Sequence, residues 1–75
     1  MKTYAHYPPT KNLNELIVKR DGDYITDVWI LESVGIPKMV YYSYKKDSQP
    51  VIPDHYDSKV ITKEKAEKML FLQMI

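Results

Sequence analysis

A tight turn at Asp21–Asp23, with glycine in its centre, is the feature that most constrains the fold of this chain. It separates two runs rich in β-branched and aromatic residues, Glu15–Arg20 and Tyr24–Glu32. Asp-Gly between such runs predicts a β-hairpin, because glycine accepts the positive φ of a type I′ turn. Val34–Pro37 supplies a second turn, and Met39–Lys46 is a third run of strand-favouring residues. This part of the chain therefore predicts three strands joined by two turns.

The side chains of these runs alternate between two faces. Along the second run the two sets are both mainly apolar: Tyr24, Val28 and Ile30 against Ile25, Trp29 and Leu31. Such a pattern predicts a central strand that is covered on both sides. Along the third run the sets are Val40, Tyr42 and Tyr44 against Met39, Tyr41, Ser43 and Lys45. The second of these sets mixes a thioether, a phenol and a charge, so we expect it to form an exposed surface.

Residues 62–74 predict the one helix. Thr62 is a good N-cap, and Glu64 lies in the first turn, near the positive end of the helix dipole. Helical spacing then gathers a sheet-facing side: Ala66, Met69, Leu70, Gln73 and Met74. The opposite side ends in Phe71, Leu72 and Ile75, so the helix becomes apolar all round. We expect that end to be covered, either by the N-terminal segment or by another chain.

The fold class predicted is α+β, a three-stranded antiparallel β-meander with one C-terminal α-helix packed on one face. A chain of 75 residues supports a single domain. We divide it into an extended N-terminal arm (1–12), the meander (13–46), a loop (47–60) and the helix (61–75). Pro8-Pro9 rule out a helix in the arm, which we expect to pack against its own domain; a free, partner-binding arm is the alternative. Residues 12–20 also fit a helical face, so a short helical turn before the first strand stays open.

Composition argues against several classes of function. The chain has no cysteine, and its histidines are His6 and His55, which are too few for a structural zinc site; we expect no metal and no cofactor. Lysine and arginine number 11 against 10 acidic residues, so charge gives no strong pull toward nucleic acid or membranes. There is no apolar run long enough for a membrane span and no secretory signal. We expect a cytoplasmic protein.

A catalytic interpretation starts at Asp54–Ser58, where a histidine stands among carboxylates and hydroxyls. Side chains adjacent in a loop point in different directions, and nothing nearby predicts a pocket around them. The simpler interpretation is a polar loop whose Asp and Ser side chains cap local turns. We therefore expect a non-enzymatic protein.

Protein binding is the function that the sequence favours most. Tyrosine (7), methionine (4), Trp29 and Phe71 supply the residue types that interface cores favour. The candidate contact residues are Met39, Tyr41 and Lys45 on the sheet and Phe71, Leu72 and Ile75 at the helix end. In size and composition the chain is similar to small phage-encoded proteins that block host machinery, anti-CRISPR proteins among them. That resemblance implies an inhibitor of a larger host protein or complex, acting in the host cytoplasm. The same apolar residues also fit a core with a homodimer contact.

DNA binding is the alternative. Basic residues at strand ends and one exposed aromatic form its candidate contacts: Lys19, Arg20, Lys38, Tyr41, Lys45 and Lys46. The segments Lys19–Tyr24 and Val60–Leu70 are similar to the N-terminal arm-binding domains of phage and transposon tyrosine integrases, over about half of the chain. The resemblance implies a three-stranded sheet backed by a C-terminal helix, with the sheet face in the major groove. Asp27 and Glu32 stand where that family would carry basic residues, and Arg20 is the only arginine.

Overall fold

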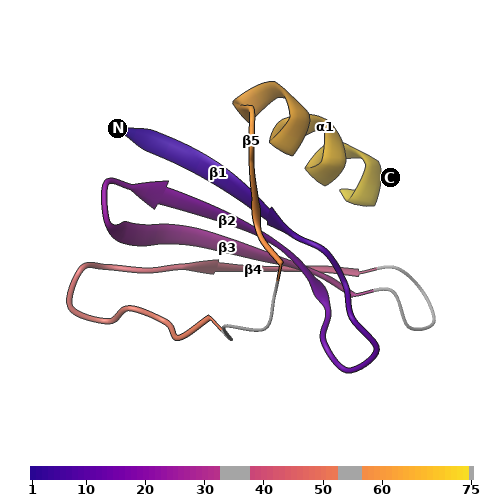
Figure 1. Ribbon diagram of the computed structural model, residues 1–75, viewed down its shortest axis with the longest axis horizontal. Coiled ribbons are helices and arrows are strands. Elements are labelled where there is room, and N and C mark those ends of the chain that lie inside the picture. The colour runs from indigo at the N-terminus through magenta and orange to yellow at the C-terminus, as the bar shows by residue number, and fades with distance from the viewer. Residues whose placement is uncertain (33–37, 53–56, 75) are drawn as a thin grey trace.

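The computed structural model describes residues 1–32, 38–52 and 57–74. Within them the chain forms a small α+β fold, an antiparallel sheet of five strands with one C-terminal helix (Figure 1). The strands lie in the order β4-β3-β2-β1-β5. Their bounds are β1 Lys2–Tyr7, β2 Glu15–Asp21, β3 Tyr24–Glu32, β4 Lys38–Ser43 and β5 Lys59–Ile61, and the helix α1 is Lys63–Met74. The predicted meander is confirmed as β2, β3 and β4, whereas the expectation of three strands in all is wrong.

The first additional strand, β1, forms from the segment that we predicted to be an arm. It pairs antiparallel with β2 over its whole length. Ala5 and Tyr7 are buried on one side of the sheet, and Tyr4 and His6 point to the other, which is the period of two that a strand requires. Pro8 follows and ends the strand, because proline has no N–H for the ladder. The arm therefore packs against its own domain, as expected, but inside the sheet.

The second additional strand, β5, lies at the junction of the predicted loop and the predicted helix. It pairs antiparallel with β1, and Ile61 stands opposite Tyr4. Val60 and Ile61 are β-branched and suit a strand. Thr62, directly after them, starts the helix, so β5 ends after three residues. The strand forms one edge of the sheet and places α1 over it.

The hairpin between β2 and β3 differs from the prediction in its turn type. Gly22 has a φ of 63°, and no described non-glycine residue has a positive φ. Positive φ at the first central position alone is the pattern of a type II′ turn, not the predicted type I′. The pairing register also shifts between Lys19 and Arg20, so β3 carries one extra residue. Beyond the shift, the side chains of β3 alternate in the opposite sense. Ile25 therefore shares a face of the sheet with Val28, whereas the sequence predicted that it shares one with Trp29.

Helix α1 covers one side of the sheet, which we call the helix face; the other side is the open face (Figure 1). Thr62 caps the helix as predicted, because its Oγ1 accepts a hydrogen bond from the Lys65 N–H at 3.1 Å. The predicted sheet-facing side is confirmed for its described members. The helix-face cluster consists of Ile17, Leu31 and Ala66, with Tyr4, Trp29, Met39, Ile61, Met69 and Leu70 packed against it. The side chains of Gln73 and Met74 lie outside the described part of the chain.

No described helix is long and apolar enough to cross a membrane. No helix among the described residues lies over the open face. Its cluster consists of Ala5, Tyr7, Leu16, Val18, Ile25 and Val28, with Leu13, Ile30, Tyr44 and Ile52 packed against it. Among the described residues that follow β4, those in the segment 44–52 pack on this face.

The side chain of Gln49 fixes the segment that follows β4. Its Oε1 accepts a hydrogen bond from the Ile25 N–H at 2.7 Å, and its Nε2 donates to the Ile25 carbonyl at 2.9 Å. Nε2 also donates to the Lys45 carbonyl at 2.9 Å. The amide thus pairs with the backbone of Ile25 as a strand residue would. It continues the ladder of β3 past the end of β4, and it holds residues 44–50 beside the sheet.

We expect Gln49→Ala to destabilise the fold by about 1–3 kcal/mol, because it leaves the part-buried N–H and C=O of Ile25 without their partner. Urea denaturation measures this free energy. Ser48→Ala is the matched control, since Ser48 is an exposed neighbour whose recorded hydrogen bond uses only its backbone N–H. Equal stability of the two variants would show that Gln49 does not anchor the segment.

Candidate functional site

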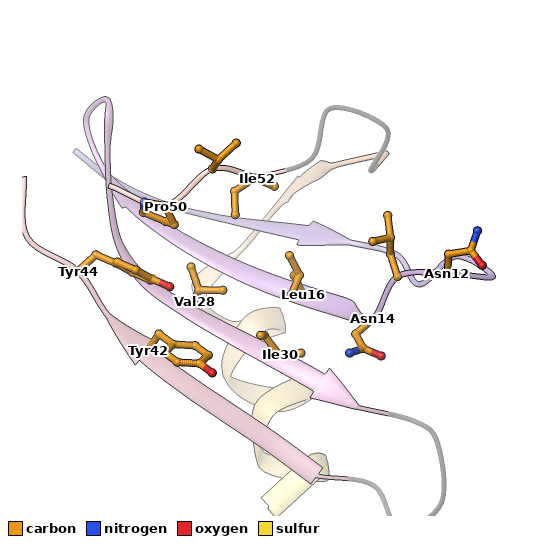
Figure 2. Close-up of a pocket in the computed structure, with 11 residues that line it drawn as sticks. Asn12, Asn14, Leu16, Val28, Ile30, Tyr42, Tyr44, Pro50 and Ile52 are labelled. Atoms are coloured by element: carbon orange, nitrogen blue, oxygen red, sulfur yellow. The ribbon is translucent and has the colours of Figure 1, made fainter. Parts of the chain in front are cut away.

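A groove on the open face is a concave site whose lining holds no charged side chain. Leu16 from β2 and Val28 and Ile30 from β3 form its floor (Figure 2). These residues share a face because β2 and β3 pair with Leu16 opposite Ile30 and Val18 opposite Val28. The groove encloses about 290 Å³. That volume lies just below the range typical of ligand pockets, roughly 300–1,000 Å³.

Three segments far apart in the sequence form the walls of the groove. Tyr42 and Tyr44 form one wall, with ring centroids 6.4 Å apart and ring planes tilted by 36°. Residues 50–52 form the second wall and residues 12–14 the third. Figure 2 shows these side chains around the floor, on the side of the sheet away from α1. The wall of residues 12–14 is held by reciprocal backbone hydrogen bonds between Thr10 and Leu13, at 3.0 and 3.4 Å.

The chemistry of the groove is apolar with a few neutral polar groups. None of its lining residues carries a charge. The amides of Asn12 and Asn14 and the hydroxyls of Tyr42 and Tyr44 are its side-chain hydrogen-bonding groups. Val51, in the second wall, is 93% exposed. The lining therefore suits an aliphatic or aromatic group that is flanked by a neutral hydrogen-bonding group, and it offers nothing to hold an ion.

The sequence-predicted sheet residues for protein binding lie elsewhere. Met39 and Tyr41 are on the helix face, because they stand opposite Leu31 and Trp29 of β3. Met39 is half-buried against the helix-face cluster, so it contributes to the core. Lys45 is exposed beyond the end of β4.

At the helix end, Phe71 is 62% exposed. The side chain of Leu72 and all of Ile75 lie outside the described part. The described candidates therefore do not gather into one patch with Lys45.

Tyr41 is held in place by two neighbours on β3. Its hydroxyl donates a hydrogen bond to Asp27 Oδ1 at 2.5 Å, and its ring lies 5.5 Å from that of Trp29. The hydrogen bond to the Asp27 carboxylate raises the pKa of Tyr41 above its ordinary value of 10.0, with smaller contributions from desolvation and from the charge of Asp27. The Tyr41 side chain thus bends inward over β3, although half of its surface is exposed.

The basic residues predicted to contact DNA are spread over both sides of the sheet. Lys19 is on the helix face, with its Nζ 5.7 Å from the centroid of the Tyr4 ring. Arg20 donates to the hydroxyl of Tyr7, whose ring is buried on the open face. Lys46 lies 4.9 Å from the ring centroid of Tyr24, at the hairpin end of the sheet.

Lys45 lies next to Lys46 at the hairpin end of the sheet, and Lys38 is at the far end of β4. A DNA-binding domain of the integrase type would place this open face in the major groove, but the face is lined mainly by apolar side chains. The described basic candidates therefore do not form one continuous patch on a single face of the sheet.

The residues considered for catalysis divide between described and undescribed segments. Asp54, His55 and Tyr56 lie outside the described residues, while Asp57 and Ser58 are exposed. The other histidine, His6, is within 2.6 Å of Glu15 on the helix face, where it ties β1 to β2. Among the described residues no three His, Cys, Asp or Glu side chains are placed to hold a metal ion.

Sequence reasoning missed most of the groove. The alternation of Val40, Tyr42 and Tyr44 did mark one apolar face of the third run, and the mainly apolar second run marked a strand that needs cover on both sides. The one predicted helix can cover only one face of the sheet. The second apolar face was therefore the signal in the sequence that could have indicated the groove. Nothing in the sequence showed that residues 50–52 fold back over it, because that path depends on Gln49 reaching Ile25.

Tyr41 should titrate above the ordinary tyrosine pKa of 10.0, and Asp27→Asn should bring the pKa of Tyr41 back toward that value. The stabilisation from this bond is fully present below the unfolded pKa, and it is lost as the pH rises through the raised folded pKa. Ultraviolet absorbance of ionised tyrosine against pH measures the titration, and subtraction of the Tyr41→Phe curve assigns it. Identical Tyr41 midpoints with and without the Asp27 carboxylate would contradict the assignment.

Comparison of the chain with protein-family models, with curated proteins and with solved structures found no match. The function must therefore be argued from the geometry of this chain alone.

Proposed function

We propose that this chain is a small non-enzymatic protein-binding module whose open-face groove receives an apolar segment of a larger protein or complex. The single observation that carries the proposal is the groove itself: a sheet face with an apolar floor that no helix of the described residues covers. Burial of apolar surface is worth roughly 25 cal/mol per Å², so filling such a groove favours association. The tyrosine wall adds the residue type most typical of interface hot spots.

The lining specifies the chemistry of the partner segment. A charged side chain in the groove would lose its hydration and gain no counter-charge, because no lining residue is ionised at neutral pH. An aliphatic or aromatic side chain fits, and the amides of Asn12 and Asn14 can hydrogen-bond to the adjacent backbone. We therefore infer a partner that inserts one or two neutral apolar side chains from a loop, strand or helix.

The size of the module supports an inhibitory mode of action. A chain of 8.9 kDa that covers an apolar surface on a larger protein acts by occupying that surface, as small phage-encoded inhibitors do. The groove offers no nucleophile other than phenols and amides among its lining residues, so its occupant is bound and not transformed. A cysteine-free chain has no need of an oxidising compartment, which agrees with action in the cytoplasm.

Tyr42→Glu should weaken partner binding about 30-fold, which corresponds to a hot-spot contribution of about 2 kcal/mol. Phe71→Glu is the matched control: it changes another exposed aromatic to the same residue, but on α1 and away from the groove. Quantitative capture from an extract of the encoding organism, followed by titration with the purified partner, compares both variants with the native chain. Circular dichroism verifies that each is folded.

Loss of binding with Phe71→Glu alone would move the interface to the helix end, and equal binding by all three proteins would overturn the proposal. A mobility shift with random DNA duplex at low salt tests the alternative function. DNA binding that weakens steeply as salt is added would favour the integrase-type interpretation over the groove.

A further inference from the structure

The outer edge of β4 presents a regular row of backbone groups. The Tyr44 N–H donates to the Thr26 carbonyl at 2.9 Å, and the register places Tyr42 opposite Val28 and Val40 opposite Ile30. In an antiparallel ladder, residues alternate between pairing inward and pairing outward. Because 44, 42 and 40 pair inward to β3, the backbone groups of Met39, Tyr41 and Ser43 point away from the sheet.

This edge lacks the usual protection against pairing with another strand. Within Lys38–Ser43 there is no proline, and the register with β3 has no shift. The one charge in the strand is Lys38, at its first position. Tyr41 does not cover the edge, since its side chain bends inward to Asp27 and Trp29. Natural sheets blunt their edges with charges, prolines, bulges or very short strands, and the opposite edge, β5, is indeed only three residues long.

We propose that β4 pairs antiparallel with β4 of a second copy of this chain, about a two-fold axis at Tyr41. Tyr41 then stands opposite Tyr41 of the second copy, and Met39 stands opposite Ser43. All three are outward-pairing residues, so three facing pairs give about six new backbone hydrogen bonds. This assembly is independent of the proposed function and leaves the groove in place.

The side chains fit the same register. On the open face, Val40 of each copy comes to lie beside Tyr42 of the other, a β-branched and aromatic cross-strand pair that stabilises sheets. The two neighbouring symmetric registers, which place Met39 or Ser43 opposite Tyr41, pair only two of the three outward residues of each strand within β4. The register centred on Tyr41 therefore forms the most backbone hydrogen bonds between two copies of this edge, and this self-complementarity is why we assign the edge to a second copy and not to an unrelated strand.

The assembly places both grooves on the same side of one continuous sheet. A two-fold axis normal to the sheet keeps the open faces together and puts both α1 helices on the opposite side. The two grooves are bounded by Tyr42 of each copy, close to the joined edges. A partner with two equivalent apolar segments would then bind both sites at once.

A single cysteine tests the register, because the native chain has none. Facing residues in a hydrogen-bonded antiparallel pair are about 5.5 Å apart between Cα atoms, within the reach of a disulfide. Tyr41→Cys should therefore form a disulfide-linked dimer under mild oxidation. Ser43→Cys should stay largely unlinked, since its counterpart in the second copy lies roughly 13 Å along the strand. A mixture of Met39→Cys and Ser43→Cys should give the cross-linked heterodimer.

Sedimentation equilibrium tests the association without cysteine. We expect the native chain to approach twice its 8.9 kDa mass, and Ser43→Pro to stay at that of a monomer, because it removes an outward N–H and leaves pairing with β3 intact. Ser43→Ala is the matched control and should dimerise. A monomeric native chain at millimolar concentration, a folded and dimeric Ser43→Pro variant, or equal cross-linking of Tyr41→Cys and Ser43→Cys would each overturn the proposal. Cross-linking still decides if Ser43→Pro fails to fold.

Discussion

Two adjacent residues in β2 set the requirement that the rest of the structure meets. Ile17 and Val18 are the largest fully buried side chains among the described residues, and because they are neighbours in a strand they point to opposite faces. A sheet that buries both must be covered on both sides. One side takes α1, which brings Ala66 against Ile17. The described residues form no second helix to cover Val18, so its burial depends on neighbouring strands and on residues 44–52.

This requirement explains which parts of the fold could be predicted. The hairpin, β3 and the capped helix follow from local signals: an Asp-Gly turn, alternating apolar residues and Thr62 before a helical pattern. Strand β1 could not be recognised as readily, because Pro8-Pro9 dominate its neighbourhood and its pairing partners are distant in sequence. The extra residue in β3 has no local signal at all. It arises only from the pairing of β3 with β2, and it moves the side chain of Ile25 to the opposite face of the sheet.

The groove is a consequence of covering the second face with a loop. A helix would lay a continuous row of side chains over Leu16, Val28 and Ile30, whereas residues 50–52 reach only one side of that floor. Tyr42 and Tyr44 bound it from the strand side. The remaining space is apolar, concave and uncharged. In a chain this small, the apolar groove thus follows from the same shortage of secondary structure that limits its core.

Two stretches of strand backbone lack a neighbouring strand, one in β3 beyond the end of β4 and one along the outer edge of β4. They differ in whether a side chain forms hydrogen bonds with them, and this difference bears on pairing with another chain. Where β3 runs past the end of β4, the chain uses the amide of Gln49 to satisfy the backbone of Ile25. Along β4 itself, no described side chain forms a hydrogen bond with the backbone of Met39, Tyr41 or Ser43. The side chain of Gln49 thus satisfies the short stretch in β3. The longer edge of β4 is regular, carries no charge at its centre, and stays available for pairing with another strand. The open edge of β4 therefore borders the groove, which lies on the face of the sheet that α1 does not cover.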